Sequence, residues 1–332
     1  MSDLRFAVIG WGYWGPKIAR NLDTLPGAQV TMVADMDPLR LVLLRQERKW
    51  STTTRPADVF AADVDGVVIA TPVRTHYALA RDALLNGKHV LVEKPLTTSV
   101  AEAEDLIALA RQMRRTLMVG HTFEYSPAVG ELRKLIAAGE LGRIYCIETE
   151  RLNLGLFRSD IDVIWDLAPH DVSILLYLLG TAPAEIRAQA CAHLRANIYD
   201  VAHLDLGFPE GMTAHIHVSW LHPCKVRRVT VMGDARMAVY DDTNPAEMLK
   251  IFNKGADIGA DPEVSYRFGA ITIPHIEWIE PLRLECEDFA NAIRTDAAPR
   301  ASGQAGLEVV KVLAAAQASL RRPVTSSMLA PA

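Results

Sequence analysis

The sequence predicts an α/β Rossmann domain, built on a doubly wound parallel sheet, followed by an α+β domain with a large, mostly antiparallel sheet. Two observations support this prediction. Over the first 120 residues, short apolar runs alternate with helical runs, which is typical of a parallel sheet covered on both faces. Later in the chain, several strand-like runs follow one another with short links such as "FPEGM", which indicates antiparallel hairpins.

The elements of the first half follow a regular order. Each β-rich run is apolar throughout and is followed by a run with helical periodicity. The predicted strands are 4–10, 28–35, 64–71, 88–94 and 116–121, and the predicted helices are 15–25, 38–48, 75–87 and 99–113.

The alternation of single strands and helices ends after about residue 122. We therefore expect a Rossmann domain over 1–122 and a substrate-binding and oligomerisation domain over 123–332. Its predicted helices are 127–139, 166–179, 278–294 and 303–320, the last of which can pack back on the first domain. Its predicted strands are 143–152, 184–195, 200–208, 211–220, 225–233 and 236–240.

The segment 242–275 is rich in Gly, Asp and Pro, and we expect an irregular functional loop or assembly arm. A sheet with helices on one face only needs cover on the other, which favours a homo-oligomer, a dimer or tetramer formed through this sheet.

Composition excludes several classes of function. The 332 residues carry a net charge of -5 without a basic block, so we expect no nucleic-acid partner. No apolar run approaches the roughly 18 to 20 residues that span a membrane. The N-terminus enters a strand at once and lacks the apolar region of a signal peptide, and the four cysteines lie far apart. These features favour a cytoplasmic protein.

The segment "GWGYWG" predicts a dinucleotide-binding turn. Gly10, Gly12 and Gly15 have GxGxxG spacing between a predicted strand and a predicted helix, whose N-terminus offers N–H groups to phosphates. The alternative is a glycine-rich turn without a ligand. Tyr13 and Trp14, which occupy free positions of the motif, can pack over the cofactor or against the sheet edge.

The end of the second predicted strand indicates which dinucleotide binds. Asp35 lies 20 residues after Gly15, where dinucleotide-binding folds place a carboxylate on the ribose hydroxyls. A carboxylate there repels a 2′-phosphate, so the sequence predicts NAD rather than NADP. The alternative is a turn aspartate without a cofactor role.

Glu93, Lys94 and Pro95 follow directly after a buried strand. Ligands of open α/β sheets bind at the carboxyl ends of strands, so Lys94 can donate a hydrogen bond to a substrate hydroxyl next to the nicotinamide. The alternative is a surface Glu–Lys pair.

Three segments together identify a family. "GWGYWG", "TPVRTHYALARDALLNGKHVLVEKPL" and "WDLAPHDVSILLYLLG" resemble the Gfo/Idh/MocA family of sugar and polyol oxidoreductases, over essentially the whole chain. The resemblance implies an active site between the two domains, with Lys94 on the reacting hydroxyl. It also implies that Thr71, Pro72, His76 and Glu93 line the cofactor groove.

The segment "WDLAPHDV" carries two further candidates. We expect Asp166 to cap a helix or to orient the substrate, because Pro169 is tolerated only in a first turn. His170 lies four residues later on the same side, and the resemblance implies that it is the acid/base on the substrate hydroxyl. The alternative is a histidine that only satisfies a carbonyl at the helix start.

Other polar residues are weaker candidates. Arg151, Asn153 and Arg158 can bind an anionic substrate or lie on a surface loop. We expect no metal site, since no cysteine or carboxylate completes a zinc site with the histidines of "AHIHVSWLH". The cations of "KVRR" are predicted to lie on a solvated strand face.

Within the family, the segments "RLNLGLFRSD" and "AHIHVSWLHPCKVRRVTVMG" are most similar to members that oxidise the 3-hydroxyl of UDP-N-acetylglucosamine. This resemblance implies a nucleotide-sugar substrate, coupling to a sugar aminotransferase and a route to a 2,3-diamino sugar of lipid A in lipopolysaccharide. The alternatives are UDP-N-acetylglucosaminuronic acid, inositol or a free sugar as substrate, or an NAD-binding regulator of a sugar pathway without catalysis. Because the chain has both Lys94 and His170, the sequence favours an enzyme.

Overall fold

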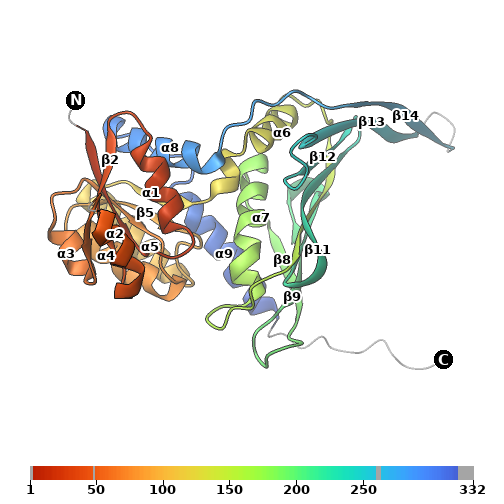
Figure 1. Ribbon diagram of the computed structural model, residues 1–332. Helices are drawn as coiled ribbons and strands as arrows, with labels where there is room; N and C mark the ends of the chain where they lie inside the picture. The colour runs from red at the N-terminus through yellow and green to blue at the C-terminus, as the bar shows by residue number, and fades with distance from the viewer. Residues whose placement is uncertain (1–2, 48, 259–262, 321–332) are drawn as a thin grey trace. The chain divides into compact units, whose positions relative to one another are not determined.

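The computed structural model describes residues 3–47, 49–258 and 263–320 (Figure 1). They form two compact units. The first unit comprises the described residues of 1–134, 172–180 and 275–311, and the second comprises those of 135–171, 181–274 and 312–332. Helices α6 (Pro127–Ala137), α7 (Val163–Leu179) and α9 (Gly303–Ser319) each contribute residues to both units.

The first unit contains a six-stranded sheet in the order β3-β2-β1-β4-β5-β6. All neighbouring strands are parallel, which confirms the predicted Rossmann architecture. The strands are β1 (Leu4–Ile9), β2 (Ala28–Ala34), β3 (Ser51–Thr53), β4 (Gly66–Ile69), β5 (His89–Glu93) and β6 (Leu117–Gly120). The strand order reverses between β1 and β4, and the carboxyl ends of strands at such a switch point form the usual ligand crevice of this fold.

The helices of the first unit come from both ends of the chain. Those that follow the strands are α1 (Gly15–Asp23), α2 (Val42–Glu47), α3 (Pro56–Ala61), α4 (His76–Leu85) and α5 (Val100–Met113). Helix α8 (Pro281–Thr295) packs in the same core, where the ring centroids of Phe289 and Phe6 are 5.7 Å apart. The Rossmann domain expected from the sequence, residues 1–122, does not contain α8, although this helix packs in its core.

Two short elements of the first unit are missing from the sequence-based prediction. Strand β3 is three residues long, and its Ser-Thr-Thr sequence has no apolar residue that would have indicated a strand. Helix α3 has six residues and begins at Pro56. The predicted helix 38–48 begins as a 3₁₀ turn over Pro38–Leu41, for which the Asp37 carboxylate accepts a hydrogen bond from the Leu39 N–H at 3.0 Å.

The second unit contains an eight-stranded sheet in the order β14-β13-β12-β11-β7-β10-β9-β8. Its neighbouring strands are antiparallel except for the parallel pair β7 and β10, which confirms the mostly antiparallel sheet. The strands are β7 (Ile144–Leu154), β8 (Glu185–Cys191), β9 (Val201–Gly207), β10 (Thr213–Ser219), β11 (Leu221–Gly233), β12 (Met237–Asp241), β13 (Leu249–Ile258) and β14 (Val264–Thr272).

The prediction that 242–275 is irregular is wrong. Strands β13 and β14 pair as an antiparallel hairpin at one edge of the sheet (Figure 1). Strand β14 is almost entirely exposed. It therefore lacks the alternation of apolar and polar residues by which a half-buried strand is recognised in a sequence.

The prediction that Asp166 is the N-cap of its helix is also wrong. Helix α7 begins at Val163, and an Asp162 carboxylate oxygen accepts hydrogen bonds from the N–H groups of Ile164 at 3.0 Å and Trp165 at 3.2 Å. Asp162 therefore supplies the cap. Pro169 lies inside the helix. No helix in the described ranges is both long and apolar enough to cross a membrane.

Candidate active site

The glycine motif forms a tight turn between β1 and α1. Gly10 has a φ of +101°, and a Cβ atom there would lie 2.4 Å from the carbonyl oxygen of Ala70. A Cβ atom on Gly15 would lie 2.0 Å from the carbonyl oxygen of Gly10. At Gly12, by contrast, the nearest atom to such a Cβ is Arg40 Nη1 at 3.6 Å. The turn therefore requires Gly10 and Gly15 for its own geometry, whereas Gly12 leaves space in front of α1 that fits a dinucleotide phosphate.

Asp35 is fixed in place after β2. Its Oδ2 atom accepts a hydrogen bond from the Trp11 N–H at 2.6 Å, and its Oδ1 atom accepts one from the Asp37 N–H at 2.8 Å. Arg40 Nη1 lies 3.4 Å from Asp35 Oδ2. The Asp35 side chain is also only 9% exposed. Its burial and these two hydrogen bonds hold the carboxylate in one orientation beside the glycine turn.

A cavity of about 450 Å³ in the first unit adjoins these groups. It brings together the predicted residues Gly10, Asp35, Thr71 and Pro72. Its full lining is Ile9, Gly10, Ala34, Asp35, Met36, Asp37, Arg40, Pro56, Ala70, Thr71, Pro72, Arg74, Thr75, Ala78 and Leu79. Sequence reasoning missed Arg40 and Arg74, because nothing in a helical run distinguishes an arginine that faces a cavity. The mixture of apolar walls, two carboxylates and two guanidinium groups fits the adenosine half of a dinucleotide.

The aromatic residues of the glycine motif divide into two groups. Trp11 packs against the core of the first unit and contacts Trp50 with their ring centroids 5.3 Å apart. Trp14 packs against the same core. Tyr13, by contrast, is largely exposed and contacts Trp14 edge to face, with Lys17 Nζ 3.3 Å from the Tyr13 ring centroid. Neither Tyr13 nor Trp14 lines the 450 Å³ cavity, so their contact with the cofactor stays a prediction.

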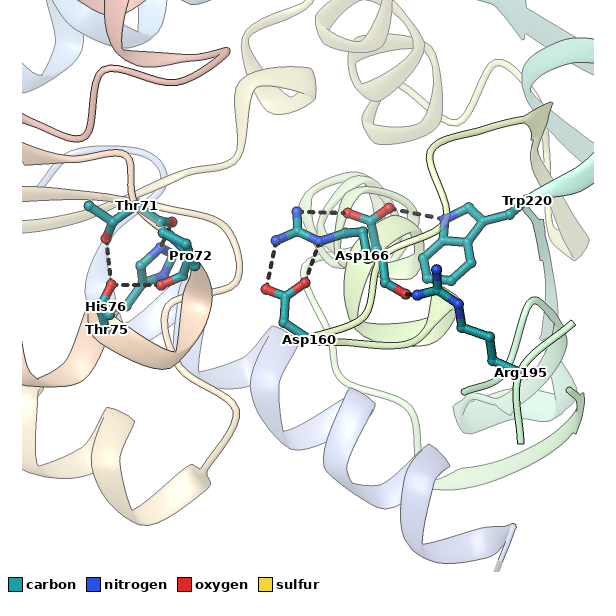
Figure 2. A network of polar contacts seen from close by, with 9 residues as sticks. Thr71, Pro72, Thr75, His76, Asp160, Asp166, Arg195 and Trp220 are labelled. Atoms are coloured by element: carbon teal, nitrogen blue, oxygen red, sulfur yellow. Dashed lines mark hydrogen bonds and ion pairs between the residues drawn. The ribbon is translucent and has the colours of Figure 1, made fainter. Parts of the chain in front are cut away.

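His76 connects two loops of the first unit, and Figure 2 shows its contact with one of them, at Thr71. Its Nδ1 atom lies 2.9 Å from the Pro95 carbonyl oxygen, and its Nε2 atom lies 2.9 Å from that of Thr71. The Thr71 hydroxyl also contacts the Thr75 hydroxyl at 2.7 Å, which donates to the Pro72 carbonyl at 2.7 Å. Buried His76 therefore holds the loop that carries Thr71 and Pro72 against the segment that follows Lys94.

Lys94 is half-buried at the end of β5 and is followed by a cis peptide bond to Pro95. The buried Glu93 carboxylate lies against Gly120 of β6, where a Cβ atom would come within 3.3 Å of Glu93 Oε2. The Lys94 N–H donates to the same oxygen at 3.3 Å. Burial raises the pKa of Glu93 to about 7, against the opposing effect of the Lys94 charge.

Further buried titratable groups surround this strand end. Burial, together with the Lys94 charge, lowers the pKa of His121 to about 3, so its imidazole is neutral at neutral pH. Burial raises the pKa of Glu124 to about 8. Burial and the nearby Glu93 charge raise the pKa of Glu285, on α8, well above its ordinary value. Sequence reasoning missed all three, although acids and a histidine within apolar runs ("VGHTFEY", "LRLECEDF") were a usable signal.

In the second unit, His170 lines a small cavity of about 80 Å³. The structure brings together the predicted residues Arg151, Asn153 and His170 there. It adds Lys225 and Arg227, which were predicted to lie on a solvated face, because β11 pairs with β7 and places Arg227 opposite Arg151. The lining is Arg151, Leu152, Asn153, Leu167, His170, Lys225, Val226 and Arg227.

Arg151 is paired with a carboxylate. Its Nε atom donates to Asp171 Oδ2 at 2.8 Å and its Nη2 atom to Asp171 Oδ1 at 3.2 Å, and both residues are buried. Burial raises the pKa of Asp171, and the Arg151 charge opposes this shift. Of the two alternatives for Arg151, the surface position is wrong, since the side chain is buried; the guanidinium fork of the other, an anion-binding residue, is already matched by Asp171.

Asp166 and Arg158 take part in another group of polar contacts, and Figure 2 labels Asp166 there with Asp160, Trp220 and Arg195. The Trp220 Nε1–H donates to Asp166 Oδ2 at 3.1 Å. Arg158 donates to both carboxylate oxygens of Asp160, at 3.0 and 2.9 Å, and its Nη1 atom lies 3.8 Å from Asp166 Oδ1. Arg195 Nη1 donates to the Arg158 carbonyl at 3.4 Å. Neither Asp166 nor Arg158 lines the His170 cavity, so their substrate contacts stay predictions.

The histidines of the sheet are engaged elsewhere. His215 Nδ1 lies 2.6 Å from Asp205 Oδ1, and His217 stacks on His203 with ring centroids 4.1 Å apart. Within the described ranges, no group of three His, Cys, Asp or Glu side chains is arranged to hold a metal ion.

Comparison with known proteins matches two successive segments of the chain to family models. The family described as "Oxidoreductase family, NAD-binding Rossmann fold" matches residues 4–121, and the GFO/IDH/MocA C-terminal domain matches residues 129–239. A UDP-N-acetylglucosamine 3-dehydrogenase from Acidithiobacillus ferrooxidans is 32% identical over 328 residues, which cover 97% of this chain and 100% of the relative. An inositol 2-dehydrogenase from Mycolicibacterium smegmatis is 32% identical over 193 residues, 56% of each chain.

Solved structures agree with this assignment. The UDP-N-acetylglucosamine 3-dehydrogenase GnnA from Acidithiobacillus ferrooxidans superimposes with a TM-score of 0.80 at 31% identity, covering 97% of this chain and 100% of that one. An oxidoreductase from Magnetospirillum magnetotacticum superimposes with a TM-score of 0.81 at 30% identity, covering 95% and 100%. With both domains matched and a full-length relative at 32% identity, the chain belongs to the Gfo/Idh/MocA family and is an NAD-dependent oxidoreductase.

Proposed function

We propose that this oxidoreductase oxidises the 3-hydroxyl of UDP-N-acetylglucosamine to the 3-keto sugar. The observation that carries the proposal is the similarity to the Acidithiobacillus enzyme, which extends over 97% of this chain and so includes both units. The inositol dehydrogenase match covers only 56% of the chain and therefore supports the class of reaction more than the substrate.

In the proposed reaction, bound NAD supplies the hydride acceptor for the carbon that carries the hydroxyl group. His170 accepts the hydroxyl proton and becomes an imidazolium ion. Lys94 donates a hydrogen bond to the same oxygen and stabilises the negative charge that develops there. The backbone of Gly10, Gly12 and Gly15 would hold the dinucleotide phosphates.

The remaining residues of the proposed site have supporting roles. Asp35 would bind the ribose hydroxyls of NAD, and Thr71 and Pro72 would form the wall of its cavity. Asn153 and Arg151 lie beside His170 and would contact or support the sugar.

A second candidate substrate is UDP-N-acetylglucosaminuronic acid. The observation that favours it is the set of cationic side chains beside His170, which could also receive a 6-carboxylate. Both substrates carry a UDP group and differ in the charge of the sugar itself.

Turnover assays distinguish these substrates. Purified protein is incubated with NAD, glutamate, a sugar 3-aminotransferase and either nucleotide sugar, and NADH is followed by absorbance. The aminotransferase removes the keto product, because oxidation of a secondary alcohol by NAD is unfavourable by itself. We expect NADH with UDP-N-acetylglucosamine. NADH only with the uronic acid would replace the proposed substrate, and NAD binding without turnover of any sugar would favour a regulator.

A His170→Ala variant tests the catalytic assignment. We expect kcat to fall about 10²- to 10⁴-fold, the usual contribution of a positioned acid/base, while the Kd for NAD changes little. His215→Ala removes a partly exposed histidine of the same unit and serves as the control. An unchanged kcat in His170→Ala would remove this residue from the mechanism.

We also propose that the protein acts in the cytoplasm as a homo-oligomer, where its product is consumed by an aminotransferase on the route to a 2,3-diamino sugar of lipid A. Exposed apolar side chains on β14 support association through the second unit: Tyr266, Phe268 and Ile271. A Phe268→Glu variant should have a lower mass than the wild type in light scattering. A monomeric wild type would contradict this part of the proposal.

A further inference from the structure

The cavity beside His170 is lined by cations and contains no carboxylate. Three of its side chains are Arg151, Lys225 and Arg227, and the remaining polar ones are Asn153 and His170. Its volume of about 80 Å³ exceeds the roughly 10 to 15 Å³ that one water molecule needs. It therefore has room for a small polyatomic group, but not for a whole nucleotide sugar.

The two arginines are balanced by neighbouring carboxylates. Arg151 forms its bidentate pair with Asp171, and Arg227 Nη1 donates to Asp242 Oδ2 at 3.0 Å. Lys225, by contrast, is exposed and forms no ion pair with any residue in the described part of the chain. The charge that remains unbalanced at the cavity is therefore the Lys225 ammonium group.

The register of the sheet explains how these groups meet. Strand β11 pairs with β7 so that Val226 lies opposite Leu152 and Arg227 opposite Arg151. Between Leu221 and Val226 the register shifts, so residues 222–225 of β11 bulge next to Asn153. Opposite residues of paired strands share a face, so Arg227 lies on the face of Arg151, and Asn153 follows Arg151 on that face. Lys225, at the end of the bulge, lines the same cavity. The cavity forms where these side chains meet His170 of α7.

We propose that this cavity is an anion subsite of the substrate, in which Lys225 and the Asn153 amide hold a phosphate or carboxylate oxygen attached to the sugar. Lys225 supplies the charge, and the amide supplies directed hydrogen bonds. Lys225 is thus a specificity-determining residue that selects anionic sugars over neutral sugars and polyols. The inference rests on the proposed function and narrows its substrate class.

The position of the subsite also affects the reaction. When His170 accepts the hydroxyl proton, the resulting imidazolium gains a negative neighbour in the subsite. The substrate anion therefore favours proton transfer as well as binding, so a neutral sugar should have both a higher KM and a lower kcat.

Equilibrium binding tests the subsite without turnover. The full-length protein is first saturated with NAD, so that inorganic pyrophosphate and UDP cannot occupy the dinucleotide site, and each probe is then titrated by calorimetry. We expect Lys225→Ala to weaken the binding of UDP and pyrophosphate about 10- to 100-fold, the usual effect of removing one charge-assisted hydrogen bond. Lys225→Arg should stay within about 3-fold of the wild type, because it keeps the charge.

The matched control is Lys250→Ala, which removes a lysine from β13 in the same sheet. We expect it to bind both probes as the wild type does. Equal binding by Lys225→Ala and the wild type would overturn the proposal. An equal loss in Lys250→Ala would also overturn it, because the effect would then reflect overall charge alone.

Steady-state kinetics identify the source of the anion. With UDP-N-acetylglucosamine and N-acetylglucosamine 1-phosphate, Lys225→Ala should lower kcat/KM about 10- to 100-fold, and with neutral N-acetylglucosamine it should change nothing. A loss confined to UDP-N-acetylglucosaminuronic acid would assign the subsite to a carboxylate. Equal losses with charged and neutral sugars would overturn the charge selection. If the wild type binds UDP through Lys225 but oxidises none of these sugars, the proposed function fails while the subsite stands.

Discussion

Arg151 of β7 and Asp171 of α7 form a buried, bidentate ion pair with N–O distances of 2.8 and 3.2 Å. Asp171 directly follows His170, and Arg151 lies two residues before Asn153. The pair therefore fixes the turn of α7 that carries the proposed acid/base against the strand that carries Asn153.

The Arg151→Ala substitution should destabilise the protein by about 3–5 kcal/mol, because it leaves the buried Asp171 carboxylate without its bidentate partner. Urea unfolding followed by circular dichroism measures this change. Arg158→Ala is the control, since Arg158 is more than a third exposed, and removing its pair should cost no more than about 1 kcal/mol. The double variant Arg151→Met, Asp171→Leu should recover much of the lost stability. A similarly small loss of unfolding free energy in Arg151→Ala and Arg158→Ala would show that the buried pair contributes little to stability.

Alanine substitutions at Gly15 and at Gly12 of the glycine motif should have different effects on stability and NAD binding. Gly15→Ala should prevent folding or lower the Tm strongly, because its Cβ atom would meet the Gly10 carbonyl oxygen at 2.0 Å. Gly12→Ala should fold with nearly the wild-type Tm, since its Cβ atom would meet only Arg40 Nη1 at an ordinary contact distance of 3.6 Å, but should bind NAD at least about 10-fold more weakly. Thermal unfolding and NAD titration separate the two outcomes. Unchanged NAD affinity in folded Gly12→Ala would contradict the placement of the phosphates.

Replacing Asp35 should change the preference between cofactors. In Asp35→Ser the Arg40 guanidinium loses one of its two carboxylate partners, at 3.4 Å, and keeps Asp37 at 3.5 Å. Because Arg74 lines the same cavity, a 2′-phosphate then lies near two cations without the Asp35 charge that repels it. We expect kcat/KM for NAD to fall about 10- to 100-fold and that for NADP to rise. Adding Arg40→Ala to Asp35→Ser should cancel the increase in kcat/KM with NADP. A wild type that uses NADP better than NAD would refute the role of Asp35.

The stability of the protein should depend on the protonation of Glu124. Its pKa rises from the ordinary 4.5 to about 8 on folding, because the carboxyl group is buried. Between these values the folded state holds a proton that the unfolded chain has released, so this contribution is full below pH 4.5 and is lost as the pH rises toward 8. The loss is up to about 1.4 kcal/mol per pH unit.

Glu124→Gln should remove that dependence, because a neutral amide does not ionise. Urea unfolding at several pH values between 5 and 8 should show the variant gaining stability relative to the wild type as the pH rises. Exposed Glu104→Gln is the control and should show a pH-independent difference. A constant difference for Glu124→Gln as well would mean that Glu124 is ionised in the folded protein throughout this range. His121 acts in the opposite direction, since its lowered pKa makes stability fall as the pH drops below about 6.5 toward 3.

The sequence predicts the parts of the fold that bury apolar surface in a regular pattern. The strands beside the glycine turn are apolar on both faces, and their positions follow from that alone. Strand β3 is too short and polar to be recognised, and β14 is too exposed to show alternation. The start of α7 was misplaced because Asp162 and Asp166 are both plausible caps, and only the backbone geometry distinguishes them.

The candidate site could be predicted only in part for a related reason. Gly10, Gly15 and Asp35 are recognisable because local spacing determines what they do. Lys225 and Glu285 are not, because their environments depend on pairing between distant segments: the register of β11 on β7, and the packing of α8 in the first unit. Sequence spacing cannot indicate that an exposed lysine at one strand end lines the cavity of a histidine 55 positions earlier.

The bulge in β11 has a consequence for how the substrate range of this enzyme can evolve. Residues 222–225 lie outside the paired register of β7 and β11, so a side chain exchanged there has no directly opposite neighbour on β7 whose packing would be lost. A single codon change at position 225 can therefore alter the charge presented to the substrate at little cost to folding. Directed evolution toward neutral sugars should find its first adaptive substitutions in these four residues, before any appear in the paired strands around them.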